Sequence, residues 1–185
     1  MSNDIFLKDL GVAALKLVPT GPTLVDINQG IPRSTVLRAM RRSLGHGLST
    51  ASFLLFGHRG FKPALEMHMS LKRRDEFTPE GRQRSFRGIA ELIEANPTYL
   101  GAFGTSWYYD PALASVSPRL AYVRDEPARH GARFAYVGVD DNITRSALGK
   151  SATRSALFAE GKYRPCAYML IWPKRDLIAY QLADR

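Results

Sequence analysis

The feature that most constrains the fold is the clustering of the expected strands along the chain. Helical and strand patterns follow one another as helix, strand, helix, strand, strand, strand, helix, strand, strand. A doubly wound parallel sheet requires strands and helices in near-strict alternation. The clustering therefore favours an α+β fold, with a mixed, mostly antiparallel sheet of five to seven strands and helices packed on it.

Two elements carry the clearest local signals. Thr78, Pro79 and Glu80 supply an N-cap, a first-turn proline and a first-turn acid, so a helix is predicted from here to Asn96-Pro97. Ala64–Leu71 alternates apolar residues with polar ones, which predicts a strand with one buried face. The core-facing residues of the helix are predicted to be Phe86, Ile89, Ala90 and Ile93.

Weaker patterns give the remaining elements, with a turn at Pro19-Thr20-Gly21-Pro22. Further helices are expected at Ile5–Val18, from Ser34 as N-cap to a stop at Gly45-His46-Gly47, and at Ile143–Glu160 with Gly161 as its C-terminal cap. Further strands are expected at Tyr99–Tyr109, Leu120–Arg124, Ala132–Val139, Tyr168–Trp172 and Leu177–Tyr180, the last two pairing with each other.

Length and composition indicate one domain spanning residues 1–185, in which residues 1–30 belong to the core, an extension or an interface. The lone Cys166 cannot form an internal disulfide, which fits a reducing compartment. The longest uncharged apolar stretch, Leu48–Phe56, is too short to span a membrane, and the N-terminus has Asp4 where a signal peptide has cations. We therefore expect a soluble, cytoplasmic protein without a membrane partner.

A formal net charge of +9 favours polyanionic partners such as nucleic acid or phosphorylated small molecules. The cations gather in two clusters, and acids are interleaved with the second one. The clusters predict either contacts with nucleic-acid phosphates or a solvated arginine face. Their members are Arg33, Arg38, Arg41 and Arg42 in the first, and Lys72, Arg73, Arg74, Arg82, Arg84 and Arg87 in the second.

Two short patterns suggest acid–base chemistry. Glu66 and His68 lie on the polar face of one strand, about 7 Å apart along it, where they form either an acid–base pair or a solvent-facing pair. Trp107, Tyr108 and Tyr109, followed by Asp110, end a presumed central strand with Trp107 and Tyr109 on one face. These aromatic residues either pack in the core or line a pocket, where the Tyr108 hydroxyl can act as a general acid.

The hexamer Arg42-Ser43-Leu44-Gly45-His46-Gly47 has the form R-x-x-G-x-G, which is similar to the pyrophosphate-binding loop of the GNAT acyltransferases. A second segment resembles the closing strand–helix–strand of that family: Arg133–Val139, Asp141-Asn142, Ala156–Tyr163 and Tyr168–Trp172. Phe158 stands where the family has its tyrosine general acid, and Lys162 separates Gly161 from Tyr163. The resemblance implies a GNAT-like fold and acyl transfer from acyl-coenzyme A.

On this resemblance the protein is a small CoA-dependent N-acyltransferase with direct attack by the acceptor amine. Glu66 or His68 would be the base and Tyr108 the acid. The phosphates would meet Arg42, Gly45 and Gly47, and the acceptor would meet Trp107, Tyr109 and Asp110.

Two alternatives stay open: a non-catalytic module that binds nucleic acid through the arginine clusters, and a partner-binding domain with neither activity. An oligomer is compatible with each of these. No metal is expected, because the four histidines lack ligand spacing, and Cys166 is expected to be an inert thiol.

Overall fold

The structure is a computed structural model that describes residues 3–140, 142 and 147–183. Six strands form one sheet in the order β1-β2-β3-β4-β6-β5. Neighbouring strands are antiparallel except β3 and β4, which are parallel. The predicted α+β fold with a mixed, mostly antiparallel sheet is therefore confirmed. The strands are β1 (Leu17–Thr20), β2 (Thr23–Gln29), β3 (Ala64–Met69), β4 (Gly101–Ser106), β5 (Arg133–Val139) and β6 (Cys166–Pro173).

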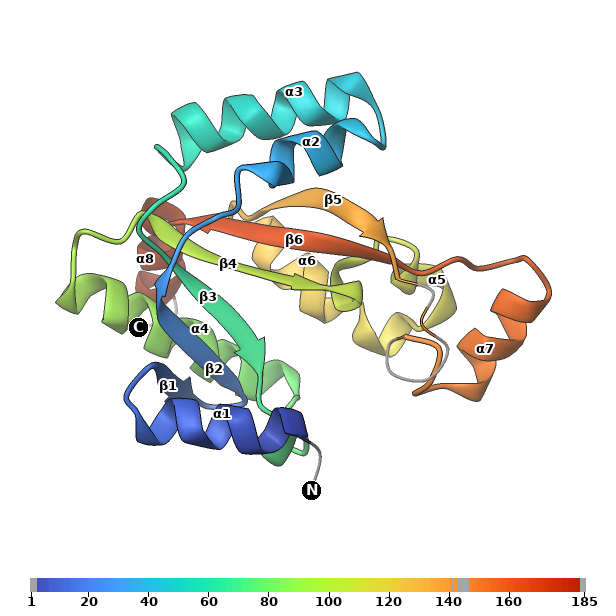
Figure 1. Cartoon of the computed structure of the whole chain (residues 1–185), viewed down its shortest axis with the longest axis horizontal. Helices are drawn as coiled ribbons and strands as arrows, with labels where there is room; N and C mark the ends of the chain where they lie inside the picture. Colours follow the sequence, from blue (N-terminus) through green and yellow to red (C-terminus); the bar gives the residue numbers. More distant parts are fainter. Residues whose placement is uncertain (1–2, 141, 143–146, 184–185) are drawn as a thin grey trace.

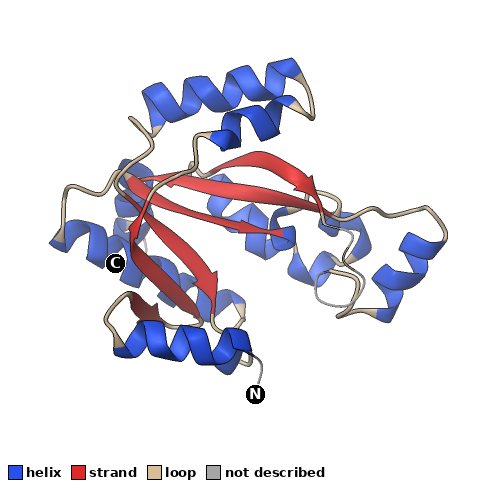
Figure 2. Cartoon of the chain, viewed as in Figure 1, coloured by secondary structure: helices blue, strands red, loops and turns tan. Residues whose placement is uncertain are grey.

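Helices cover both faces of the sheet (Figures 1 and 2). On one face lie α2 (Ser34–Met40) and α3 (Leu44–Ser52), and on the other lie α4 (Pro79–Ala95), α6 (Tyr122–Arg129) and α8 (Lys174–Leu182). Helix α1 (Asn3–Ala13) lies beside β1 and β2. The remaining helical segments are α5 (Leu113–Val116), α7 (Ala152–Ala159), a π-helical turn at Phe53–Gly57, and 3-10 turns at Leu71–Arg73, Trp107–Tyr109 and Pro118–Leu120.

The larger hydrophobic core lies between the sheet and α4. The predicted α4 stripe is confirmed, because Phe86, Ile89, Ala90 and Ile93 are all buried, and Phe86 meets the Trp172 ring edge-on at 4.9 Å between ring centroids. The predicted start is also confirmed: the Thr78 hydroxyl accepts the Gly81 N–H, and Pro79 occupies the first turn. Asn96 ends the helix as predicted.

A smaller core lies under α2 and α3 on the other face. Ile31, Leu54, Phe103 and Met169 are buried there. Two separate cores arise because β4 and β6 are covered on both faces, so alternate side chains of each strand are buried in different layers.

Two predicted strands are wrong. Leu120–Arg124 lies in a 3-10 turn and α6, and Leu177–Tyr180 lies in α8. In α8 the buried residues are Leu177, Tyr180 and Gln181, whose spacing is helical. Such short apolar runs suit either state, and packing against α4 selects the helix.

The helix predicted from Ser34 to Gly45-His46-Gly47 is also different. Helix α2 ends at Met40, and Gly45 and Gly47 lie in the first turns of α3, whose N-cap Ser43 accepts the His46 N–H. The N-cap of α2 is Arg33, not Ser34. A second helix starts here because the Ser43 side chain caps its N-terminus, and this stabilises helix more than Gly45 and Gly47 disfavour it.

Several boundaries move by a few residues. Strand β4 ends at Ser106, and Trp107–Tyr109 form a 3-10 turn instead of continuing the strand. In the first thirty residues, α1 ends at Ala13 and not at Val18, and β1 and β2 form a hairpin that the sequence did not predict. The predicted turn is present, with Gly21 at φ +67°. In the predicted helix 143–160, residues 143–146 lie outside the described residues and α7 covers the last part, with Gly161 after its end at φ +69°.

Candidate functional site

The parallel strands β3 and β4 pair at only two positions, Leu65 with Ala102 and Glu66 with Phe103. Beyond these, the C-terminal halves of the two strands have no ladder pairing with each other. A cavity of about 250 Å³ opens between them. Its lining residues come from α1, β2, β3, β4, α4, α6 and three connecting segments, and they are Lys8, Thr23, Met67, His68, Met69, Phe77, Arg82, Gly104, Thr105, Ser106, Trp107, Tyr108, Tyr109, Val123 and Lys150.

Arg82 forms a buried cationic wall of this cavity. Its side chain is 6% exposed, lies over the Phe86 and Phe77 rings, and donates to the hydroxyls of Thr23 (3.3 Å) and Tyr109 (3.5 Å). Its Nε has no hydrogen-bond partner among the described residues. A buried guanidinium without a carboxylate is costly, and a bound anion would reduce that cost.

A second cationic group lies at Lys150. Burial and the neighbouring charges of Arg74, Arg154 and Lys8 all lower the pKa of Lys150. Lys8 also donates to the Met69 carbonyl at 3.3 Å. Because these cations repel one another, this side of the cavity has a positive potential that attracts anions.

Glu66, His68 and Asp26 lie together on the face of β2 and β3 opposite α4. Glu66 is directly across from Asp26 in the register, and its Oε2 lies 3.9 Å from His68 Nε2. Burial raises the pKa of the Glu66 carboxyl, His68 opposes the rise, and Asp26 adds to it. The predicted proximity of Glu66 and His68 is thus present, but only His68 lines the cavity and Glu66 does not. A carboxyl with a raised pKa is a stronger base when it is ionised, and here it lies next to an imidazole.

The 3-10 turn after β4 carries Trp107, Tyr108 and Tyr109 into the cavity wall. The Trp107 and Tyr108 rings stack at 3.9 Å between centroids, so the predicted alternation of faces does not hold. Burial raises the pKa of Tyr108, and its hydroxyl therefore stays protonated at neutral pH. The guanidinium of Arg154 lies 4.7 Å from the centroid of the Trp107 ring and stabilises this turn.

Asp110 holds two backbone segments together and has no contact with the cavity. Its carboxylate accepts the N–H groups of Ala112 (3.0 Å) and Cys166 (2.9 Å), so it joins the turn after β4 to the start of β6. Asp110 does not line the cavity, whereas Trp107 and Tyr109 do.

Arg42, Gly45 and Gly47 lie apart from this cavity, at the junction of α2 and α3. The Arg42 guanidinium lies 5.8 Å from the ring centroids of Tyr136 and Tyr168. The structure therefore does not bring these three residues together with His68 and Tyr108.

The second arginine cluster does not form one solvated face. Arg82 is buried, Arg73 and Arg84 each lie 3.8 Å from Glu76, and Lys72 pairs with Asp9 at 2.7 Å. The first cluster, on α2 and its flanks, is exposed.

Among the described residues, no three or more His, Cys, Asp or Glu side chains form a group that could hold a metal ion. Cys166 is half-buried, and burial raises the pKa of its thiol. In the described part of the chain no helix has the length and apolar character needed to cross a membrane.

Sequence reasoning found His68, Trp107, Tyr108 and Tyr109, named Arg82 only as one member of an arginine cluster, and missed Lys8 and Lys150. Lys8 and Lys150 are 142 positions apart in the numbering, and only the tertiary fold brings them near one cavity. Arg82 follows Gly81 in the first turns of α4, and the four-residue spacing from Arg82 to Phe86 was the one local sign that it faces the core.

Comparison with known proteins gave no match: no family model, curated protein or solved structure is significantly similar to the chain.

Proposed function

We propose that the protein is an acyltransferase that uses an acyl-coenzyme A, and that the β3–β4 cavity is its active site. The single observation that carries the proposal is the opening of the parallel pair after Glu66 and Phe103 into a cavity lined by buried Arg82. Pockets at the carboxyl ends of parallel strands are common ligand sites.

Coenzyme A suits this cavity in two respects. Its phosphates match the positive potential around Arg82 and Lys150. Its extended arm carries amide groups, which can hydrogen-bond to strand edges that lack a ladder partner. Gly104 lets β3 lie close to β4, because a Cβ there would lie 3.0 Å from the Met67 carbonyl oxygen. In this proposal the cations of the cavity bind the phosphates. The phosphate contacts predicted from the sequence for Arg42, Gly45 and Gly47 stay a prediction.

The chemistry is direct transfer to an amine. The acceptor nitrogen attacks the thioester carbonyl carbon while His68, which lines the cavity, takes the amine proton, and the Glu66 carboxylate 3.9 Å away stabilises the protonated imidazole. The carbon–sulfur bond breaks, and the protonated Tyr108 hydroxyl gives its proton to the leaving sulfur. The proton on the base then returns to the Tyr108 oxygen through solvent.

Calorimetric titration with acetyl-coenzyme A tests the proposal, with ATP as the nucleotide control. We expect the wild type to bind acetyl-coenzyme A, Lys150→Ala to bind it more weakly, and Arg38→Ala, an exposed cation of α2, to match the wild type. Transfer is then measured as free thiol released in the presence of a panel of amines. Absence of wild-type binding, or equal loss in both variants, would contradict the proposal.

A further inference from the structure

Another surface lies over α2, α3 and the π-helical turn Phe53–Gly57. The segment 27–65, which contains these elements, has no Asp or Glu but has six Lys and Arg residues. All six are exposed, and Arg42 also lies 5.8 Å from the ring centroids of Tyr136 and Tyr168, so the segment exposes positive charge with no acid of its own to offset it. They are Arg33, Arg38, Arg41, Arg42, Arg59 and Lys62.

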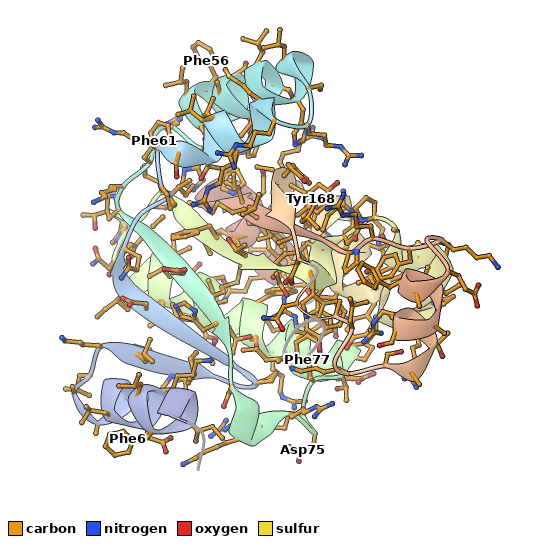
Figure 3. All side chains as sticks on the ribbon, turned by 45° about the vertical axis from the view of Figure 1, so that its right-hand side comes forward. Phe6, Phe56, Phe61, Asp75, Phe77 and Tyr168 are labelled. Carbon is orange, nitrogen blue, oxygen red and sulfur yellow. The ribbon has the colours of Figure 1, made fainter. Side chains whose placement is uncertain are left out.

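The same layer exposes a row of large apolar side chains. Leu44, Leu48, Leu55 and Phe56 are each more than half exposed, and Phe56 is 80% exposed. Their spacing places them on one side of the continuous helical rod, whereas Leu54 on the other side is buried against the sheet. Figure 3 shows Phe56 on the outer side of this layer. We call these four residues the α3 ridge.

Cations flank both ends of the α3 ridge. Arg41 and Arg42 precede Leu44, and Arg59 and Lys62 follow Phe56. Leu37 of α2 adds an exposed apolar side chain next to Arg38. An exposed apolar row bordered by long cationic side chains is the pattern of a helix that lies in a membrane interface.

We propose that the α3 ridge binds the surface of an anionic phospholipid bilayer, with α3 parallel to the membrane plane. The apolar side chains would enter the boundary with the acyl chains, and the cations would contact the headgroup phosphates. This binding mode needs no membrane-crossing helix, and it does not depend on the proposed acyl transfer.

The charge of the layer selects this occupant over two others. A second copy docked through the same surface would bring two acid-free cationic layers together, which repel each other. A nucleic acid would pair with the arginines but would leave Leu48 and Phe56 in contact with charged phosphates. An anionic lipid surface offers both negative charge and an apolar interior.

Co-sedimentation with vesicles measures the binding directly. We expect the full chain to bind vesicles of equal parts phosphatidylglycerol and phosphatidylcholine, and not vesicles of phosphatidylcholine alone. The double variant Leu48→Asp/Phe56→Asp should lower the affinity by at least about tenfold for each apolar side chain removed from the bilayer. The matched control is Leu7→Asp/Leu10→Asp on α1, where the exposure is similar and the charge change is the same.

A fluorescent reporter locates the contact. Phe56→Trp and Leu15→Trp each replace a side chain that is 80% exposed, the first on the α3 ridge and the second just after α1. Both variants are expected to fold, because neither site is in the core. After the emission of Trp107 and Trp172 in the wild type is subtracted, anionic vesicles should shift the emission of the introduced Trp to the blue in the Phe56 variant only.

Four results would overturn the proposal. They are no binding to anionic vesicles, binding that the ridge variant keeps, equal blue shifts in both reporters, and a dimer in solution that the ridge variant dissociates. The last result would assign the α3 ridge to a second copy of the chain. Binding of an oligonucleotide that the ridge variant abolishes, without vesicle binding, would assign it to nucleic acid instead.

Discussion

The β3–β4 cavity and the α3 ridge place the same kinds of side chain in opposite surroundings. In the cavity a cation is buried, since Arg82 lies over the Phe86 ring at 4.5 Å with its Nε unpaired. On the ridge, apolar side chains are in water and the arginines around them are exposed. Both arrangements are unfavourable for the isolated chain, because one buries a charge and the other exposes apolar area.

Each region therefore indicates the kind of ligand that would remove its unfavourable free energy. A small anion would neutralise the buried guanidinium, and an apolar layer with a negative surface would cover the ridge. The regions also differ in how mutations should act. Changes around the cavity affect the core and the chemistry, whereas changes on the ridge leave the fold intact.

The largest expected effect separates the core under α4 from the ridge. Trp172 is fully buried between α4 and α8, and its Nε1 donates to the His130 carbonyl at 2.8 Å. Trp172→Ala should lower the free energy of unfolding by about 3–5 kcal/mol, whereas Phe56→Ala should change it by less than about 0.5 kcal/mol. Urea unfolding followed by circular dichroism measures both, and equal effects would mean that Phe56 is packed in solution.

The next effect concerns chemistry at the cavity. If His68 and Tyr108 transfer protons, His68→Ala and Tyr108→Phe should each lower kcat by roughly 10²-fold or more. Thr105→Ala is the control, because Thr105 lines the same cavity but does not titrate near neutral pH. Steady-state release of coenzyme A measures the rates, and unchanged kcat in both variants would remove these residues from the mechanism.

A smaller effect tests the buried cation directly. Arg82→Met keeps the apolar stem but removes the charge, so acetyl-coenzyme A affinity should fall roughly ten- to hundredfold. Arg38→Met, on the exposed side of α2, should leave this affinity unchanged. Calorimetric titration gives both constants. Wild-type affinity in Arg82→Met would show that the guanidinium does not contact the ligand.

The smallest effect is a pH dependence of stability. Because the pKa of Glu66 is raised in the folded state above its usual 4.5, folding favours the protonated carboxyl. The wild type should therefore lose stability relative to Glu66→Gln as the pH rises through the folded-state pKa. We expect Glu66→Gln to unfold at higher urea concentration at pH 7, with the difference disappearing below about pH 4.5. A difference that does not change with pH would exclude an ionising Glu66 as its cause.

Short sequence patterns correctly predicted the elements that are stabilised by interactions between nearby residues. The Thr78 cap with Pro79 gave the start of α4, and the alternation from Ala64 gave β3, because capping and side-chain periodicity act over a few residues. The mixed sheet was predicted from a clustering of strands that is not there: the two strands that produced it are helical, and from β3 onward each strand is followed by a helix. Leu177–Tyr180 was mistaken for a strand because a four-residue apolar run has no unique period, and only packing on α4 makes it helical.

For the candidate site, the sequence by itself supplied the residue types, with Glu66 and His68 on one strand and the aromatic run after β4. The tertiary structure alone decided that β3 and β4 are parallel neighbours, that their pairing stops after Glu66 and Phe103, and that Lys8, Arg82 and Lys150 meet there. It also decided which arginines are buried and which apolar side chains of α3 remain exposed. The physical reason is that strand pairing and burial depend on contacts between residues far apart in the chain, which no local pattern encodes.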